Sequence, residues 1–226
     1  MHQINWGIIG PGSIADAFAY SIQATKNSKL ISVLGRDSKK VNSFAQKFHI
    51  NAHYQLDDFI SSEEIDAIYI ATPHSEHFFY AIEAIKNGKH VLCEKPLTMN
   101  AHESMILLAL ANEKNIFLME AFMYRVHPQT RNILDNLDFL KDAQDKIMIE
   151  ASFGFQADIP ESHRLRNPEL GGGAILDVGC YPLTMSKLIA GHLQDLSYAD
   201  PESLSAIGQL DETGVDLQTY AHLIFS

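Results

Sequence analysis

The 226-residue sequence predicts an α/β domain built on a parallel, doubly wound sheet, followed by an α+β domain with a mostly antiparallel, incomplete open sheet. In the first 120 residues, short apolar runs alternate with segments of helical spacing, which is typical of βαβ units. These runs are continuously apolar, which indicates a sheet covered on both faces. Further along, polar and apolar residues alternate within the predicted strands, as in a sheet with one solvent-exposed face. We therefore expect two domains, residues 1–121 and 122–226.

The first domain is a regular alternation of predicted strands and helices. Strands are predicted at residues 5–10, 30–35, 52–55, 66–72, 89–93 and 116–119. Helices are predicted at residues 13–26, 38–48, 75–87 and 100–115. Gly88 follows the third helix, as glycines beyond helix ends often do, and Asn100 with Glu103 is a typical capping pair at the start of the fourth.

The second domain is predicted to contain helices at residues 128–140 and 172–190, and strands at residues 146–155, 203–210 and 216–226. Residues 156–170 hold two prolines and few apolar side chains, which indicates a loop. The DETG segment at 211–214 is typical of a turn between the last two strands. The final strand is apolar and carries no charge after Asp216, so we expect a second copy of the chain or further strands to cover its edge.

The composition excludes several classes of protein. A net charge of −11 is unsuited to nucleic-acid binding, which needs clustered Lys and Arg. Two cysteines, Cys93 and Cys180, exclude a disulfide scaffold and fit a reducing compartment. No apolar run approaches the ~18 residues of a membrane span, and the N-terminus lacks the features of a signal peptide. The expected location is therefore the cytoplasm, without a membrane partner.

A glycine-rich loop follows the first predicted strand. Residues 10–15 (GPGSIA) match G-x-G-x-x-A, a variant of the dinucleotide-binding fingerprint. Gly10 allows a tight turn, Gly12 lets the backbone approach a pyrophosphate, and the following helix begins with free N–H groups. At the start of a βαβ unit, this pattern favours a Rossmann domain that binds a dinucleotide over a turn without a ligand.

The residues after the second strand bear on the choice of cofactor. An arginine there suits the 2′-phosphate of NADP, whereas an acidic residue suits the 2′-hydroxyl of NAD. Arg36 comes first and Asp37 second, with Lys39 and Lys40 close behind. We therefore predict NADP, with NAD as the alternative.

Two further segments follow predicted strands, ATPHSEH at 71–77 and CEKP at 93–96. Open parallel sheets bind ligands beyond the carboxyl ends of their strands. Lys95 is therefore predicted to reach a nicotinamide and its substrate. In the second domain, Asp177 and Tyr181 are spaced i, i+4 and so share one face of the predicted helix.

Taken together, these motifs resemble the Gfo/Idh/MocA family of oxidoreductases. The shared segments are GPGSIA, ATPHSEH, GKHVLCEKP at 88–96, EAFMYR at 120–125 and GGGAILDVGCY at 171–181. Within this family, a tyrosine followed by a proline, as at Tyr181 and Pro182, resembles the branch that contains the dimeric dihydrodiol dehydrogenases and glucose–fructose oxidoreductase. Members usually continue with more strands of a large sheet that also forms the dimer surface. The chain thus resembles a C-terminally short member, and a homodimer is implied if its sheet is complete enough.

The resemblance implies roles for individual residues. Lys95 would bind the substrate hydroxyl, Tyr181 would donate or accept its proton, and Asp177 would support the pair. The cofactor would be lined by Gly10, Gly12, Ser13, Ile14, Arg36, Thr72, His74, His77, Glu94 and Arg125. His74 and His77 have no evident third ligand, so we expect no metal.

The implied reaction is hydride transfer between NADP and a sugar, polyol, diol or related carbonyl compound. A proton must then leave or join the substrate oxygen, and a lysine beside a tyrosine suits this step because a nearby cation favours the phenolate. Two alternatives stay open: an NAD-dependent polyol dehydrogenase, and a non-catalytic protein that senses the dinucleotide, which the incomplete sheet motivates. Each residue also has a structural interpretation: Lys95 at a strand end, Tyr181 as a half-buried ring and Asp177 as a helix-start carboxylate.

Overall fold

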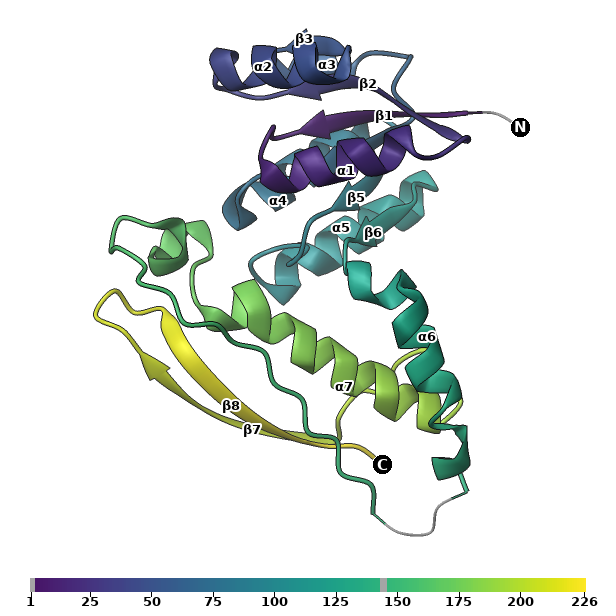
Figure 1. The fold of residues 1–226 in the computed structure, drawn as a ribbon, viewed down its shortest axis with the longest axis vertical. Helices are drawn as coiled ribbons and strands as arrows, with labels where there is room; N and C mark the ends of the chain where they lie inside the picture. Colours follow the sequence, from purple (N-terminus) through teal and green to yellow (C-terminus); the bar gives the residue numbers. More distant parts are fainter. Residues whose placement is uncertain (1–2, 143–145) are drawn as a thin grey trace. The chain divides into compact units, whose positions relative to one another are not determined.

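The computed structural model describes residues 3–142 and 146–226, and the chain divides into two compact units, Met1–Ala121 and Phe122–Ser226. The N-terminal unit holds a six-stranded parallel sheet with helices on both faces, and the C-terminal unit combines helices with a two-stranded antiparallel sheet (Figure 1). The predicted fold class, a doubly wound α/β domain followed by an α+β domain, is confirmed. Within the described residues, none of the helices has both the length and the apolar character that crossing a membrane requires.

The sheet of the N-terminal unit has the strand order β3-β2-β1-β4-β5-β6, and all neighbouring strands in it are parallel. Its strands are β1 (Ile4–Ile9), β2 (Ser28–Leu34), β3 (Asn51–His53), β4 (Ala67–Ile70), β5 (His90–Cys93) and β6 (Leu118–Glu120). The order reverses between β1 and β4, so the chain leaves these two strands in opposite directions. The carboxyl ends of such a strand pair are where open α/β sheets bind ligands.

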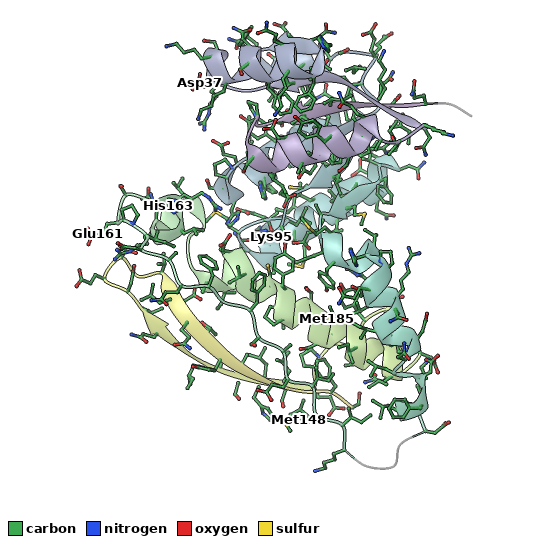
Figure 2. All side chains as sticks on the ribbon, viewed as in Figure 1. Asp37, Lys95, Met148, Glu161, His163 and Met185 are labelled. Carbon is green, nitrogen blue, oxygen red and sulfur yellow. The ribbon has the colours of Figure 1, made fainter. Side chains whose placement is uncertain are left out.

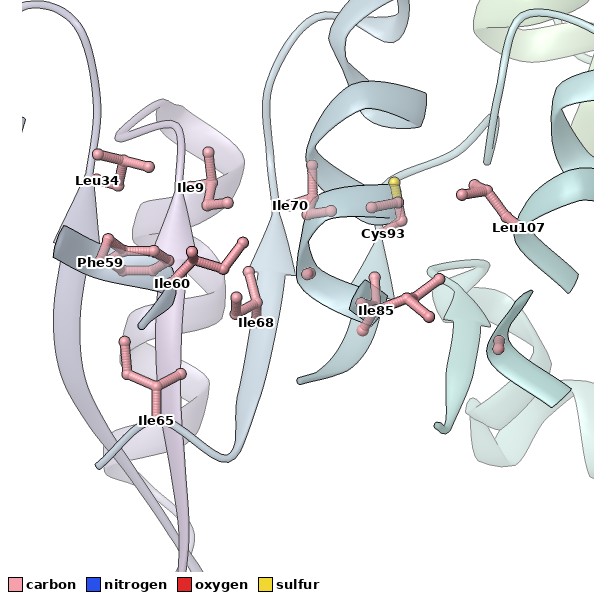
Figure 3. Packing of buried hydrophobic residues seen from close by; sticks show 14 residues of the cluster. Ile9, Leu34, Phe59, Ile60, Ile65, Ile68, Ile70, Ile85, Cys93 and Leu107 are labelled. Carbon is pink, nitrogen blue, oxygen red and sulfur yellow. The ribbon is translucent and has the colours of Figure 1, made fainter. Parts of the chain in front are cut away.

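Helices cover both faces of this sheet. They are α1 (Ser13–Gln23), α2 (Ser38–Phe48), α3 (Leu56–Ile60), α4 (His74–Lys86) and α5 (Ala101–Lys114). Two neighbouring residues of β1 point to opposite faces: Ile8 packs into a cluster with α1 and α2, and Ile9 into a cluster with α3, α4 and α5. Figure 3 shows the second cluster, in which Ile9, Phe59 and Ile85 come from a strand and two helices. Both faces are buried, as the continuously apolar strands predict.

The predicted elements of this unit are present, with ends that differ by a few residues. The helix predicted at 38–48 has those bounds in the structure, and Asn100 caps α5 by accepting a hydrogen bond from the Glu103 N–H at 3.0 Å. The helix predicted at 13–26 ends earlier, at Gln23. Helix α3 was not predicted, because its five residues are too few to display helical periodicity.

The C-terminal unit is built from two longer helices and a hairpin. Its main elements are α6 (Pro128–Asp135), α7 (Cys180–Leu193), β7 (Ser203–Leu210) and β8 (Asp216–Ile224). A π-helical turn, Ile175–Gly179, comes directly before α7, and short 3-10 turns occur at Met123–Val126, Asp138–Leu140, Arg164–Arg166 and Pro168–Leu170. The hairpin is antiparallel, with Ser203 opposite Ile224, and its β7 bounds are those predicted.

Three predictions for the C-terminal unit are wrong in detail. Residues 146–155 form no strand, because an alternating pattern shows which side chains share a face but does not supply a hydrogen-bonding partner. The helix predicted at 128–140 stops at Asp135. The helix predicted from residue 172 starts later, because Gly171 and Gly173 have φ angles of 72° and 106°, outside the helical range.

The hairpin is more exposed than its alternating sequence suggests. Every side chain of β7 is exposed, and the large apolar side chains on its two strands include Leu204, Ile207 and Tyr220 at 60%, 74% and 62% exposure. The predicted solvent-exposed face of this sheet is therefore present, but β7 has no buried face within the described residues.

Candidate functional site

A pocket lies at the carboxyl ends of β1, β2 and β4, where the strand order predicts a ligand. It has a volume of about 250 Å³ and is formed by residues 9–12, by residues 35–37 with Lys40, and by residues 71–73 with Glu76 and Tyr80. Four of the predicted cofactor residues line it: Gly10, Gly12, Arg36 and Thr72. Lys40, which the sequence analysis counted in favour of NADP, lines it too, as do Glu76 and Tyr80, to which the sequence analysis gave no role.

The glycine loop at one side of the pocket has the geometry that its sequence predicts. Gly10 has a φ of +94°, and a Cβ at this position would lie 2.8 Å from the carbonyl oxygen of Ala71, so the turn requires glycine. Gly12 is different: it has an extended backbone with φ −106°, and a Cβ there would meet nothing within 4 Å. Ala15, in the first turn of α1, is fully buried. The space beside Gly12 therefore lies open for a ligand to approach the backbone.

The start of α1 suits an anion. Gly12 is the N-cap residue and contributes no side-chain cap, so the first-turn N–H groups keep their polarity toward the loop. Ser13 and Ile14, both predicted cofactor residues, are the first two residues of this helix.

Thr72 contributes a second feature that fits a polar ligand. Its hydroxyl oxygen is buried and has no hydrogen-bonding partner among the described residues. A buried hydroxyl without a partner is costly, and a ligand group in the pocket would relieve that cost. The open space at Gly12, the helix N-terminus and the unpaired Thr72 hydroxyl together fit a dinucleotide.

The two residues that bear on cofactor choice are engaged differently. The Arg36 guanidinium forms an ion pair of 2.8 Å with the Glu76 carboxylate, and its side chain is 77% exposed. Asp37 caps α2: its Oδ1 accepts hydrogen bonds from the N–H groups of Lys39 and Lys40 at 3.0 and 3.2 Å. Asp37 thus serves as the cap of a helix, whereas the Arg36 side chain is largely exposed and pairs with the more buried Glu76.

The loop that carries Lys95 leaves the carboxyl end of β5 (Figure 2). Three side chains from other elements hold it. The Tyr69 hydroxyl donates a hydrogen bond to the Glu94 carboxylate, and the Glu120 carboxylate accepts one from the Leu97 N–H at 2.7 Å. Burial raises the pKa of Glu120, while the hydrogen bond from Leu97 and the charge of Lys95 oppose this. The Lys95–Pro96 peptide bond is cis.

His77 is the third support of this loop. Its Nδ1 lies 2.7 Å from the Pro96 carbonyl oxygen and its Nε2 lies 2.9 Å from the Thr72 carbonyl oxygen. The residue is 0% exposed, and burial lowers its pKa. In the structure its ring is buried and links the loops after β4 and β5, and the role toward the cofactor that the sequence analysis gave His77 stays a prediction.

His74 is also largely buried, with its ring centroid 5.8 Å from that of His77. In the part of the chain that the structure describes, no group of three or more His, Cys, Asp or Glu side chains could hold a metal ion.

In the C-terminal unit, Tyr181 lies in the first turn of α7 among aromatic side chains. Its ring centroid is 5.5 Å from that of Phe122, 6.0 Å from that of Tyr124 and 5.4 Å from that of Phe153. These contacts hold the ring of Tyr181 against aromatic side chains that come from residues 122–124 and from Phe153.

Asp177 lies in the π-helical turn one turn before Tyr181, and its carboxylate forms an ion pair of 3.8 Å with Arg164. The predicted cofactor residue Arg125 stacks on the Tyr198 ring in the same unit, at 4.2 Å from the centroid. The assigned roles of Asp177, Tyr181 and Arg125 stay predictions.

The glycines before α7 serve contacts within the unit. A Cβ on Gly173 would collide with the Asp216 carboxylate, which accepts a hydrogen bond from the Ile175 N–H at 2.8 Å. Asp216 therefore caps the helical segment from β8. The sequence analysis missed the role of Asp216, which is distant in sequence and gave no local signal.

Comparisons with known proteins bear on this site. A family model described as an oxidoreductase family with an NAD-binding Rossmann fold matches residues 4–122. Trans-1,2-dihydrobenzene-1,2-diol dehydrogenase of Xenopus tropicalis is 36% identical over 214 residues, which cover 93% of this chain and 62% of the relative. D-xylose 1-dehydrogenase (NADP(+)) of Hypocrea jecorina is 30% identical over 238 residues, which cover 96% of this chain and 61% of the relative. The chain spans less than two thirds of the length of these relatives.

Solved structures resemble the fold. A 3-ketoreductase from Actinomadura kijaniata in complex with NADP and TDP-benzene has a TM-score of 0.78 and 25% identity, over 97% of this chain and 66% of that one. GenD2 from gentamicin A biosynthesis in complex with NAD has a TM-score of 0.84 over 100% of this chain and 63% of that one; at 20% identity, this likeness concerns the fold alone.

Proposed function

Since this chain belongs to the Gfo/Idh/MocA family of oxidoreductases, we propose that the protein is an NADP-dependent oxidoreductase acting on the CH–OH group of a sugar, polyol or diol, or on the matching carbonyl compound. The observation that carries the proposal is the pocket beyond β1, β2 and β4, with its open space at Gly12 and with Arg36 and Lys40 in its wall. The relatives named for a diol and for D-xylose support the substrate class.

Different residues of the pocket would bind different parts of the dinucleotide. The backbone at Gly12 and the start of α1, with Ser13 and Ile14, would hold the pyrophosphate. Arg36 would pair with the 2′-phosphate, because a guanidinium matches phosphate geometry. The Thr72 hydroxyl would gain the partner that it lacks among the described residues.

Bound NADP supplies the hydride acceptor or donor, and the protein handles the substrate oxygen and its proton. We assign Lys95 to binding that oxygen, because its loop is fixed from three sides beyond β5. The Tyr181 phenol would donate the proton in reduction and accept it in oxidation. Asp177, paired with Arg164, would support the start of α7 that carries Tyr181. Glu94 and His77 would act by holding the loop of Lys95.

The experiment compares Lys95→Met with the wild type and with Lys86→Met, a change at an exposed lysine on α4 that pairs with Glu83. NADPH affinity is measured by calorimetry, and turnover with a panel of aldoses, polyols and trans-dihydrodiols. We expect Lys95→Met to bind NADPH as the wild type does and to lose turnover by about 100-fold or more, with Lys86→Met unchanged. Unchanged turnover in Lys95→Met would refute the catalytic assignment.

The same panel separates the alternatives. Tighter binding of NADH than of NADPH would favour an NAD-dependent polyol dehydrogenase. The position of Asp37 in the pocket wall supports this alternative. Binding of the cofactor without turnover of any substrate would favour a sensor. A homodimer through the sheet of the second domain stays a proposal, and native mass measurement tests it.

A further inference from the structure

The ion pair between Arg36 and Glu76 crosses the wall of the cofactor pocket. Arg36 follows β2, and Glu76 is the third residue of α4, which follows β4. Their charged groups are 2.8 Å apart, and both residues line the pocket. The pair therefore joins the loop after β2 to the first turn of α4, and the proposed adenosine end of the cofactor would bind between these two segments.

The two members of the pair differ in freedom. The Arg36 side chain is 77% exposed, whereas that of Glu76 is 23% exposed. Glu76 lies in the first turn of α4, where the helix dipole favours a negative charge. The carboxylate is thus the more buried partner and the guanidinium the more exposed one. Arg36 can exchange its partner without any movement of α4.

A 2′-phosphate would compete with Glu76 for the same guanidinium. A carboxylate held beside Arg36 occupies the cation that a phosphate needs, and it also repels the phosphate charge. NAD carries a neutral hydroxyl at this position, so the carboxylate costs it little.

We propose that Glu76 is a specificity-determining residue that weakens NADP binding relative to NAD by acting as the internal counter-ion of Arg36. The inference rests on the proposed function, because it concerns the same pocket and cofactor. Glu76 sets how strongly the pocket discriminates between the two dinucleotides, while Arg36 sets the direction of that preference. Tyr80 lines the same pocket: burial raises the pKa of its phenol, the Glu76 charge raises it further, and the Arg36 charge opposes this.

The experiment measures the Kd of NADPH and of NADH by calorimetry for the wild type, Glu76→Gln, Arg36→Ala and the double variant. Glu83→Gln is the matched control, because Glu83 is on the same helix, pairs with Lys86 and is not in the pocket wall. Thermal unfolding of each variant checks that it is folded. The adenosine fragments 2′,5′-ADP and 5′-ADP repeat the comparison without the nicotinamide.

We expect Glu76→Gln to tighten NADPH and 2′,5′-ADP by about threefold and to change NADH and 5′-ADP by less than about 1.5-fold, as the loss of an exposed competing ion pair should. The gain should shrink in the Arg36→Ala background, and it should shrink in high salt. Glu83→Gln should change neither affinity.

Three results would overturn the inference while leaving the proposed function intact. Glu76→Gln could weaken NADH, which would mean that the carboxylate binds the ribose hydroxyls. It could tighten both dinucleotides equally, or its gain could persist in full without Arg36. Failure of the wild type to bind either dinucleotide would instead refute the proposed function, and the inference with it.

Discussion

Replacing Gly10 with alanine should destabilise the N-terminal unit. The substitution places an alanine at φ +94°, which costs about 1–2 kcal/mol for a residue with a Cβ in the left-handed region. The new Cβ would also lie 2.8 Å from the carbonyl oxygen of Ala71, and relieving such a contact costs about 1–3 kcal/mol. We therefore expect the free energy of unfolding to fall by about 2–5 kcal/mol.

The assay is urea unfolding followed by tryptophan fluorescence. Trp6 is the single tryptophan of the chain and lies on β1, in edge-to-face contact with Phe18 at 5.3 Å between ring centroids, so its signal reports the N-terminal unit. Gly12→Ala is the matched control. An added Cβ there meets nothing within 4 Å, so its unfolding free energy should change by less than about 1 kcal/mol.

For cofactor binding, the order of the two variants should be reversed. Gly12→Ala, the more stable variant, should show the larger loss of NADPH affinity. The Cβ of Gly12→Ala would fill the space through which the pyrophosphate is proposed to approach the backbone, so this variant should keep its stability and lose NADPH affinity. The reasoning would be refuted if Gly10→Ala unfolded within about 0.5 kcal/mol of the wild type, or if Gly12→Ala proved the less stable of the two.

Further predictions concern other parts of the molecule. His77→Leu removes the ring that lies between the Pro96 and Thr72 carbonyl oxygens; a neutral imidazole donates to one of them, so the variant should lower the free energy of unfolding by about 1–3 kcal/mol in urea. Burial lowers the pKa of His77 below its ordinary 6.5, so the unfolded chain binds the proton more readily than the folded one. The contribution of His77 to wild-type stability should therefore be full above pH 6.5 and decline below it. The His77→Gln variant should lack this part of the decline. Gly173→Ala should disrupt the cap that Asp216 provides to the segment before α7, seen as a loss of helical circular dichroism on mild heating. Hydrogen bonds from Thr213 and the ion pair with Arg166 lower the pKa of Asp211 to about 2, so its stabilising contribution should be present above about pH 4 and lost toward pH 2, and Asp211→Asn should remove that dependence from acid-unfolding curves.

Local sequence signals predict most of the N-terminal unit. Buried strands and amphipathic helices leave a pattern along the chain, and the glycine loop follows a strand; Gly10 and Gly12 line the pocket at that strand's end, and their role in cofactor binding stays a prediction. Helix α3 was missed because five residues hold less than two helical turns. The strand predicted at 146–155 was wrong because its alternation carries no information about a partner.

The contacts that position the candidate site were harder to predict, because they join residues far apart in the chain. Nothing near Pro96 shows that its carbonyl oxygen faces His77, and nothing near Gly173 indicates Asp216. The sequence analysis assigned the histidine to the cofactor because it belongs to a motif, and that role stays a prediction. The structure adds a contact that the motif does not reveal, because the buried His77 ring also holds the loop after β5.

Contacts from residues distant in sequence hold the whole loop from Glu94 to Leu97. Its supports come from three separate elements: Tyr69 on β4, His77 on α4 and Glu120 at the end of β6. Because β4 and β6 flank β5 on its two sides, the loop is tied to the sheet on both sides of the strand from which it emerges. The backbone at Lys95 is then as fixed as the sheet itself, while the lysine side chain stays only half-buried. A group that must bind a substrate oxygen repeatedly in one place needs that combination, since orientation is lost when the supporting contacts are loose.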